Sequence, residues 1–321
     1  MRVETRAGTR FRLTYGDDGS LRSSAVGLDR SVLDPLLIEL ARDAGADVRL
    51  GVAARGVRDG RVLVESGEIQ ARVIVGADGL RSIVARSGGV TTAPPLGDRS
   101  ALTFHVADPD PAQPRDARMV LFDGGYAGLA PVAGGRVNVG IVLVSGTWRA
   151  RLRERGADDV VRAVLAAISA AADDPVTWRD AEIVDRIEGV APVGARVRRR
   201  AGNGWLLVGD AAGFLDPFTG EGLHRALVSA RLAAPAIRRA LDGDVTALAA
   251  YDRDLARRTR GKDLVSRVVQ GFLAAPPAFD YAARRLADRP LVRETMGRVI
   301  GDLLPASAAL DPRFLAALLR P

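Results

Sequence analysis

The residues with the clearest potential for chemistry lie in one glycine-rich stretch, residues 205–232, which reads WLLVGDAAGFLDPFTGEGLHRALVSARL. It opens with four apolar residues, 205–208, a run typical of a strand buried on both faces. Gly209 and Asp210 follow directly. Small residues let a ligand approach the backbone closely, and Asp210 places one carboxylate at the same point. The pattern therefore predicts a ligand site at the end of a buried strand.

A proline- and glycine-rich turn, residues 216–222, then leads into a helix expected to begin near Leu223. Apolar residues recur at helical spacing after that point, at Leu223, Ala226, Leu227 and Ala230. A helix N-terminus that follows glycines favours anions, because its N–H groups and its dipole point outward. The bland alternative is an ordinary strand–loop–helix unit without a ligand.

This stretch resembles the second flavin-binding motif of FAD-dependent hydroxylases and of geranylgeranyl-reductase-like flavoproteins. The wording DPFTGEG is closer to the reductase-like branch. The resemblance implies that Gly209 and Asp210 bind FAD, the Asp through the ribitol hydroxyls. It also implies that the isoalloxazine ring is lined by Pro217, Gly220, Glu221 and Gly222. The helix N-terminus would face the N1–C2=O edge, where reduced flavin carries negative charge.

A second motif lies earlier, in residues 71–86, which read as a buried strand, a tight turn and a helix that opens at Ser82. Its VGADGLRSIVAR segment resembles the Asp-Gly motif of the same family. The resemblance implies that Asp78 and Gly79 lie near the FAD pyrophosphate, and it links the motif to contact with a nicotinamide cofactor. The helix N-terminus that follows suits phosphate.

Residues 30–45 predict another helix, with Asp29 as the N-cap and Gly45 as the stop. Leu33, Leu36, Leu37, Leu40 and Ala41 share one face of it. The segment Arg30 to Asp34 resembles a family segment whose arginine reaches the FAD phosphates. An ordinary surface arginine in a first helical turn explains Arg30 equally well.

The middle of the chain predicts an antiparallel substrate sheet, from alternating strands at 101–106, 118–122 and 136–144. A helix is expected over 158–172 and a long strand over 183–190. Residues 126–140 resemble a geranylgeranyl-reductase-like stretch, Tyr-x-Trp-x-Phe-Pro followed by Asn-Val-Gly, which makes Tyr126 and Pro131 candidate substrate-lining residues. Gly128 and Ala130 stand where that stretch has Trp and Phe. The resemblance therefore does not carry over a prenyl-chain substrate.

The expected fold class is α/β, or α+β overall: a Rossmann-like FAD/NAD(P)-binding domain, an antiparallel β substrate domain and C-terminal helices. The expected boundaries are 1–98 with 191–241 for the FAD-binding domain, 99–190 for the substrate domain and 242–321 for the helical region. The Gly-x-Gly-x-x-Gly βαβ unit with which the family begins is not found in residues 1–28. Either the recorded start is an internal Met, which we favour, or the chain is a shortened product. In both cases we expect weak FAD binding and low stability.

Composition narrows the function class. The chain has 321 residues, 47% hydrophobic and 26% charged, with no cysteine and two histidines, so disulfides, a metal site and a cysteine nucleophile are not expected. The net charge is +7, but the arginines are scattered and no nucleic-acid-binding motif accompanies them. Neither a signal peptide nor an apolar run long enough to span a membrane is apparent, which predicts a cytoplasmic protein. Residues 242–321 would cap a substrate cavity, pack as core or make peripheral membrane contact.

Together these features predict an FAD-dependent oxidoreductase acting on a small, apolar organic substrate. It would be an NAD(P)H-linked reductase or a monooxygenase. No side chain is assigned as a catalytic acid or base. Glu221 is the only candidate near the ring, and its neighbours in the sequence give it no special character. The alternative is a non-catalytic protein, derived from a flavoenzyme, that binds a small molecule or a partner chain.

Overall fold

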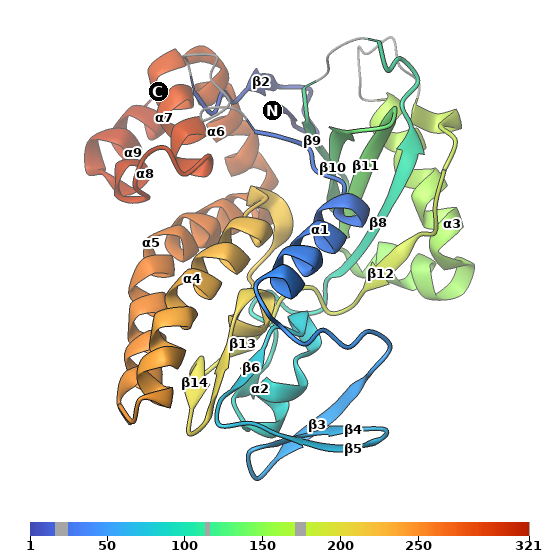
Figure 1. The fold of residues 1–321 in the computed structure, drawn as a ribbon. Coiled ribbons are helices and arrows are strands. Elements are labelled where there is room, and N and C mark those ends of the chain that lie inside the picture. The colour runs from blue at the N-terminus through green and yellow to red at the C-terminus, as the bar shows by residue number, and fades with distance from the viewer. Residues whose placement is uncertain (17–24, 113–115, 171–177, 321) are drawn as a thin grey trace. The chain divides into compact units, whose positions relative to one another are not determined.

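The computed structural model describes residues 1–16, 25–112, 116–170 and 178–320 (Figure 1). The chain divides into two compact units. Unit 1 comprises Met1–Leu37, Asp98–Pro192 and Arg267–Pro321, and unit 2 comprises Ile38–Gly97 and Val193–Ser266. This division differs from the predicted boundaries, because the N-terminal residues group with the middle of the chain and the C-terminal helical region is shared. The roles predicted for these parts stay predictions.

A seven-stranded sheet forms the centre of unit 1, in the order β12-β8-β11-β10-β9-β1-β2. Its strands are β1 (Arg2–Glu4), β2 (Arg10–Arg12), β8 (Ser100–Ala107), β9 (Arg118–Phe122), β10 (Gly125–Val132), β11 (Arg136–Leu143) and β12 (Glu188–Val190). All neighbours are antiparallel except β1 and β9. The predicted antiparallel sheet is confirmed, and β8, β9 and β11 follow the expected strands closely.

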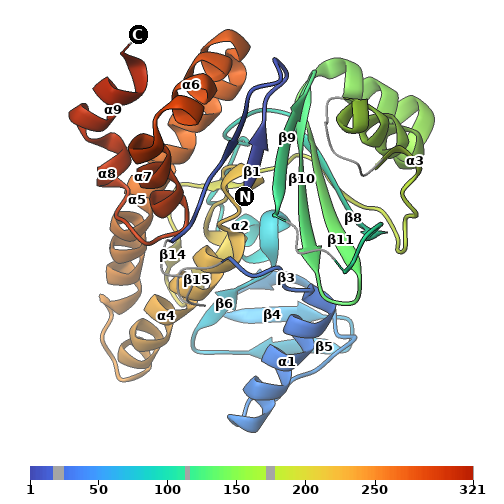
Figure 2. The same ribbon diagram turned by 90° about the horizontal axis from the view of Figure 1, so that it is seen from above.

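Helix α3 (Gly146–Ala170) covers one face of this sheet (Figures 1 and 2). Alternate strand residues point toward it and form a core with the helix: Leu102, Phe104, Val106, Ala127, Leu129, Val137, Val139, Ile141, Val160, Val164, Leu165 and Ile168. Because side chains alternate along a strand, Thr103, His105, Gly128 and Asn138 belong to the opposite face, which we call the open face. This part of the open face therefore carries small and polar residues.

Two predicted elements of this region differ in extent. The helix expected over 158–172 corresponds to the part of α3 that follows Gly156, where a positive φ of 83° interrupts the helix, and a further helical segment that starts at Gly146 precedes this break; residues 171–172 lie outside the described part. The strand expected over 183–190 is paired only at β12 and at a single bridge from Ile183 to Val106. Asp185 explains the interruption, because its carboxylate accepts the backbone N–H of His105 at 2.7 Å.

The N-terminal strands are held by a buried ion pair. Glu4 on β1 and Arg118 on β9 form a two-pronged contact, with distances of 2.7 and 3.0 Å, and both side chains are almost fully buried. Such planar, charge-assisted pairs fix strand register well. Strand β2 then lies at the edge of the sheet.

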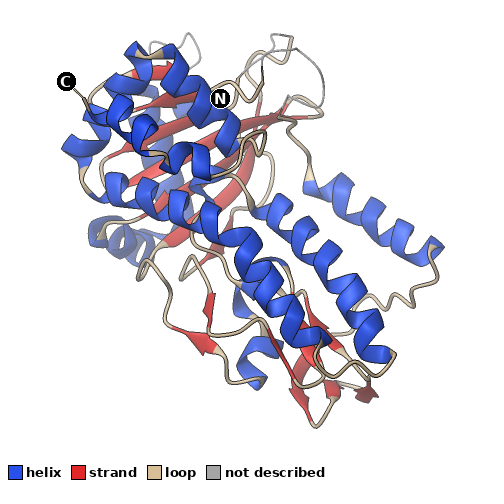
Figure 3. Cartoon of the chain, turned by 90° about the vertical axis from the view of Figure 1, so that its left-hand side faces the viewer, coloured by secondary structure: helices blue, strands red, loops and turns tan. Residues whose placement is uncertain are grey.

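Helices dominate the C-terminal region (Figure 3). They are α5 (Ala247–Ala274), α6 (Pro276–Asp288), α7 (Pro290–Ile300), α8 (Ser307–Leu310) and α9 (Pro312–Leu319). Gly297 of α7 packs directly on the N-terminal segment, since a Cβ there would lie 2.2 Å from the carbonyl oxygen of Thr14. In the described ranges we find no helix with the length and apolar character needed to cross a membrane.

Unit 2 holds three small sheets: β14-β15-β6, β3-β4-β5 and β13-β7. The strands are β3 (Ala54–Arg58), β4 (Arg61–Val64), β5 (Gly67–Gln70), β6 (Ile74–Gly76), β7 (Thr91–Thr92), β13 (Arg196–Val197), β14 (Ala201–Gly202) and β15 (Trp205–Leu207). Helices α2 (Ile83–Ser87), α4 (Gly222–Leu241) and the first part of α5 complete it. Ile74, Leu206, Leu207, Ala233, Ala236 and Tyr251 belong to its core.

Helix α1 (Arg30–Asp43) forms as predicted. Asp29 caps it by accepting the Ser31 N–H at 2.8 Å. Its apolar face, however, stays open to solvent in the part of the chain that is described. Leu36 and Leu40 are 50% and 55% exposed, and no residue of the helix is buried. The sequence pattern identified the helix correctly but says nothing about what covers its face.

Candidate functional site

The two predicted cofactor motifs follow neighbouring parallel strands of unit 2. Strand β6 pairs with β15 in register, Ile74 opposite Trp205 and Gly76 opposite Leu207. Each strand is followed by a short 3-10 turn, η2 (Gly79–Arg81) and η4 (Gly209–Ala212), and the two turns contact each other. The carboxyl ends of parallel strands are where open α/β sheets bind their ligands. Asp78 and Gly79 are thus brought beside Gly209 and Asp210.

Gly209 occupies a left-handed conformation, with φ of 57°. Its N–H donates to the hydroxyl oxygen of Ser229 at 2.8 Å, and that hydroxyl donates in turn to the carbonyl of Ala226 at 2.9 Å. Ser229 is 2% exposed. It therefore fixes the start of the loop on helix α4. The sequence analysis did not single out Ser229, although a serine at a buried position of a helix is a usable signal.

The Asp78 side chain has a structural role, because it helps to cap helix α2. Its carboxylate accepts the N–H of Ile83 at 2.7 Å, and the Ser82 hydroxyl accepts the N–H of Ala85 at 3.0 Å. These two bonds cap helix α2, which has only five residues. The N-terminus of α2, expected to suit phosphate, therefore has two of its N–H groups already bonded to side chains. A role for Asp78 and Gly79 near a pyrophosphate stays a prediction.

The second half of the later motif forms a tight, preorganised turn. Asp216 accepts the N–H of Phe218 at 3.0 Å, and Pro217 opens η5 (Pro217–Thr219). Gly220 ends this turn in the left-handed region, with φ of 70°. We call residues 209–222 the 209–222 loop. It delivers the chain into α4, which begins at Gly222.

The N-terminus of α4 differs from that of α2 because no side chain in the described part of the protein caps it. The first N–H groups of any α-helix lack a partner within the helix. A Cβ built at Gly220 or at Gly222 would meet no atom within 4 Å. Open space and outward-pointing N–H groups therefore coincide at this end of α4, which suits a planar group with partial negative charge.

The Glu221 side chain turns to a buried cluster of charges. One carboxylate oxygen lies 3.1 Å from the Lys262 Nζ, and the other lies 3.4 Å from the Arg225 Nε. Arg225 also contacts Asp263 at 2.5 Å. Burial opposes the charged form of Arg225, but the Asp263 and Glu221 carboxylates outweigh it and raise the pKa of Arg225. The cluster ties the 209–222 loop to helix α5.

Sequence reasoning missed Lys262, although one signal was available. It is the only lysine in a chain with many arginines, and it is 9% exposed. A lone lysine in the middle of a long helix pattern is a candidate for a specific partner.

The remaining predicted residues lie in unit 1. Arg30 makes a two-pronged ion pair with Asp34 on the same helix, at 2.5 and 2.7 Å, as a surface arginine commonly does. Tyr126 is 4% exposed and lines a cavity at one end of β10. Pro131 lies toward the other end, where a Cβ on Gly27 would overlap its carbonyl oxygen. The structure therefore does not bring Tyr126 and Pro131 to one point.

A family model described as an FAD binding domain matches residues 5–268 of this chain. A digeranylgeranylglycerophospholipid reductase of Methanosarcina mazei is 32% identical over 233 residues, which is 68% of this chain and 54% of that protein. A second such reductase, from Methanopyrus kandleri, is 32% identical over 236 residues, 68% of this chain and 57% of that protein. The chain thus spans somewhat more than half the length of these relatives.

Solved structures share the fold. A flavoprotein/dehydrogenase from Cytophaga hutchinsonii superposes with a TM-score of 0.76 at 19% identity, covering 98% of this chain and 77% of that one. A flavin-dependent brominase superposes with a TM-score of 0.75 at 19% identity, covering 94% and 75%. At this level of identity the likeness concerns the fold alone.

Proposed function

Because this chain belongs to the family of FAD binding domains, we propose that it acts as an FAD-dependent oxidoreductase. It would reduce a small, apolar organic substrate with electrons from NADPH or NADH. When bound, FAD supplies hydride transfer. The protein positions the cofactor and sets the electrostatic surroundings of the ring, and residues of the 209–222 loop would do both.

The proposal rests on one observation, the geometry of the 209–222 loop. It follows a buried parallel strand, it leads into an uncapped helix N-terminus, and the space beside Gly220 and Gly222 is open. These features fit the edge of an isoalloxazine ring. The N–H groups at the start of α4 would favour negative charge at the flavin N1.

Two carboxylates of the loop would then have opposite roles. Asp210 would accept hydrogen bonds from the ribitol hydroxyls. Glu221 would stay turned toward Lys262 and Arg225, so that its charge is balanced and does not oppose electron gain by the ring. We assign no proton-transfer role to either residue.

Two observations favour reduction over hydroxylation. The relatives that match over 68% of the chain are named as reductases, and the DPFTGEG sequence resembles the reductase-like branch more than the aromatic hydroxylases. The open face of the large sheet has Gly128 in register with Gly140 and Ala130 in register with Asn138. The two glycines and the alanine leave room for an apolar molecule at these positions, and none of the four residues supplies an aromatic ring.

An anaerobic reaction separates the two chemistries. The protein is loaded with FAD, reduced with NADPH, and mixed with a geranylgeranyl ether lipid or with a shorter apolar alkene. The proposal predicts that the flavin is reoxidised without oxygen and that the product gains two hydrogens. Reoxidation that needs oxygen, with an oxygen atom in the product, would instead identify a monooxygenase.

A further inference from the structure

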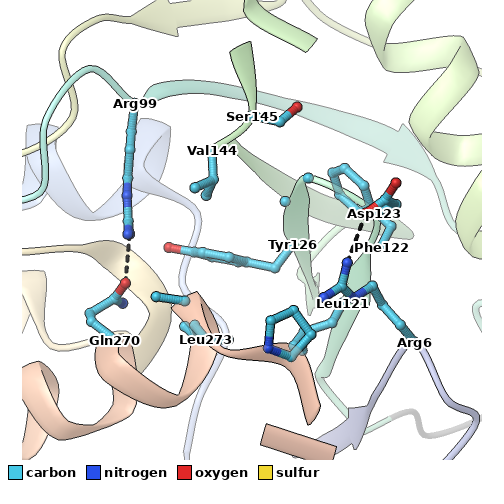
Figure 4. Close-up of a pocket in the computed structure, with 14 residues that line it drawn as sticks. Arg6, Arg99, Leu121, Phe122, Asp123, Tyr126, Val144, Ser145, Gln270 and Leu273 are labelled. Carbon is cyan, nitrogen blue, oxygen red and sulfur yellow. Dashed lines mark hydrogen bonds and ion pairs between the residues drawn. The ribbon is translucent and has the colours of Figure 1, made fainter. Parts of the chain in front are cut away.

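A cavity of about 230 Å³ lies within unit 1, at the ends of strands β9, β10 and β11 and beside the last turns of α5 (Figure 4). We call it the Arg99 pocket. None of its lining residues belongs to the 209–222 loop or to any other part of unit 2. What the pocket binds is thus a separate question from whether the chain holds FAD.

One end of the pocket is polar. The Arg99 side chain is nearly buried, since the residue is 8% exposed, and its Nη1 donates to the Gln270 Oε1 at 2.5 Å. Figure 4 shows the Tyr126 hydroxyl pointing toward this pair. A guanidinium, an amide and a phenol from three distant segments therefore converge. Such a set can hold one compact polar group by several hydrogen bonds.

The rest of the wall is largely apolar. Side chains of the strand ends, of the last turn of α5 and of the first residue of α6 supply it: Leu121, Phe122, Val144, Leu273, Ala274 and Pro276. Tyr126 adds its ring, and the whole residue is 4% exposed. A ligand that fits must therefore combine one polar group with an apolar body.

The charge of the lining residues indicates the sign of that polar group. Two arginines, Arg6 and Arg99, line the pocket together with a single carboxylate, Asp123. That carboxylate is 99% exposed at the rim and pairs with Arg6 at 2.8 Å. The buried end thus carries a guanidinium whose planar fork matches carboxylate and phosphate groups.

We propose that the Arg99 pocket binds a small organic anion, with its carboxylate or phosphate on Arg99 and Tyr126 and its apolar body against the strand ends. Since one water molecule occupies about 30 Å³ in the liquid, a cavity of about 230 Å³ has room for about eight non-hydrogen atoms, which is the polar group and most of the chain of a medium-length fatty acid. The proposal requires neither FAD nor the function proposed above.

The first test compares two probes of the same shape, octanoate and octanamide, by isothermal titration calorimetry on the full chain. Hydrogen bonds to a charged group are stronger than neutral ones, so octanoate should bind at least about tenfold more tightly. Hexyl phosphate, compared with hexyl alcohol, tells whether phosphate is accepted as well as carboxylate.

Variants locate the site. Gln270→Glu places a carboxylate beside the Arg99 guanidinium with little change of shape, so it should keep the protein folded and weaken octanoate binding about tenfold or more. Tyr126→Phe should weaken octanoate binding by a smaller factor. Arg186→Gln is the matched control, because Arg186 belongs to the same unit and its side chain is 86% exposed.

Three results would overturn the proposal. The first is equal affinity for octanoate and octanamide. The second is octanoate binding that Q270E leaves unchanged. The third is that neither octanoate nor hexyl phosphate binds at about 10 mM. Thermal unfolding of each variant, recorded alongside, separates a lost site from a lost fold.

Discussion

At the scale of single residues, the contact between Glu221 and Lys262 links the candidate flavin loop to the rest of unit 2. A buried carboxylate that loses its partner is costly, because the low-dielectric surroundings do not solvate the charge. Arg225 would remain beside Glu221 and limit the loss. The pair therefore matters more for the position of the loop than for total stability.

We predict that Lys262→Met lowers the free energy of unfolding by about 2 kcal/mol. Because the loop is no longer held on α5, FAD affinity should fall as well. Urea unfolding and fluorescence titration with FAD measure the two effects.

The control for this variant is Arg257→Met on the same helix, where the side chain is 80% exposed. Glu221→Gln in combination with K262M should recover part of the stability, since the uncompensated charge is then removed. If K262M changed neither quantity, the loop would not depend on this contact.

At the scale of elements, the connection between α4 and α5 depends on Asp244. Its carboxylate accepts the Thr246 N–H at 2.9 Å, the Thr246 hydroxyl at 2.7 Å and the Arg239 Nε at 3.0 Å. The bonds from Thr246, followed by the Arg239 contact, lower the pKa of Asp244 from 3.8 to about 2. The ionised carboxylate thus favours the folded state.

A pH dependence follows from the sign of that shift. The pKa is lower in the folded protein than in the unfolded chain, so the stabilisation is complete above 3.8 and disappears as the pH falls toward about 2. Asp244→Asn should therefore lower the urea midpoint near pH 7, and the gap from the original protein should narrow near pH 3. Asp254→Asn serves as the control, and a gap independent of pH would contradict the assignment.

The elements themselves were largely predictable, because their patterns are local. Apolar alternation located β8 and β11, and a continuous apolar run located β9. The helix that starts at Arg30 follows from Asp29 and from the spacing of its leucines. Non-local contacts were not predictable. Nothing in the sequence around Asp185 indicates that its side chain takes the N–H of His105 and interrupts a strand.

The same division holds for the candidate site. The sequence predicts a ligand site at each of the two glycine motifs, and the parallel pairing of β6 with β15 brings the motifs together. Ser229 and Lys262 act through contacts with residues 20 and 41 positions away, which spacing rules do not address. The sequence likewise does not indicate that Asp78 caps helix α2, because this hydrogen bond depends on how the turn folds.

At the scale of the whole molecule, the resemblance drawn from the two motifs is confirmed by the family match over residues 5–268 and by the reductase relatives. The boundaries of the two compact units differ from the predicted domain boundaries. Strand β1 enters the large sheet beside β9 because Glu4 finds its partner in Arg118, more than a hundred residues away. The N-terminal segment is thereby part of unit 1.

The central claim is that the 209–222 loop holds a flavin, and a titration of the full chain with FAD and with FMN tests it most directly. Because Asp210 would contact only the ribitol, which both flavins carry, Asp210→Ala should weaken both by the same factor, about tenfold or more, with the unfolding midpoint nearly unchanged. Asp254→Ala is the surface control. Equal flavin affinity of D210A and the unchanged protein, or no saturable binding of either flavin, would contradict the account.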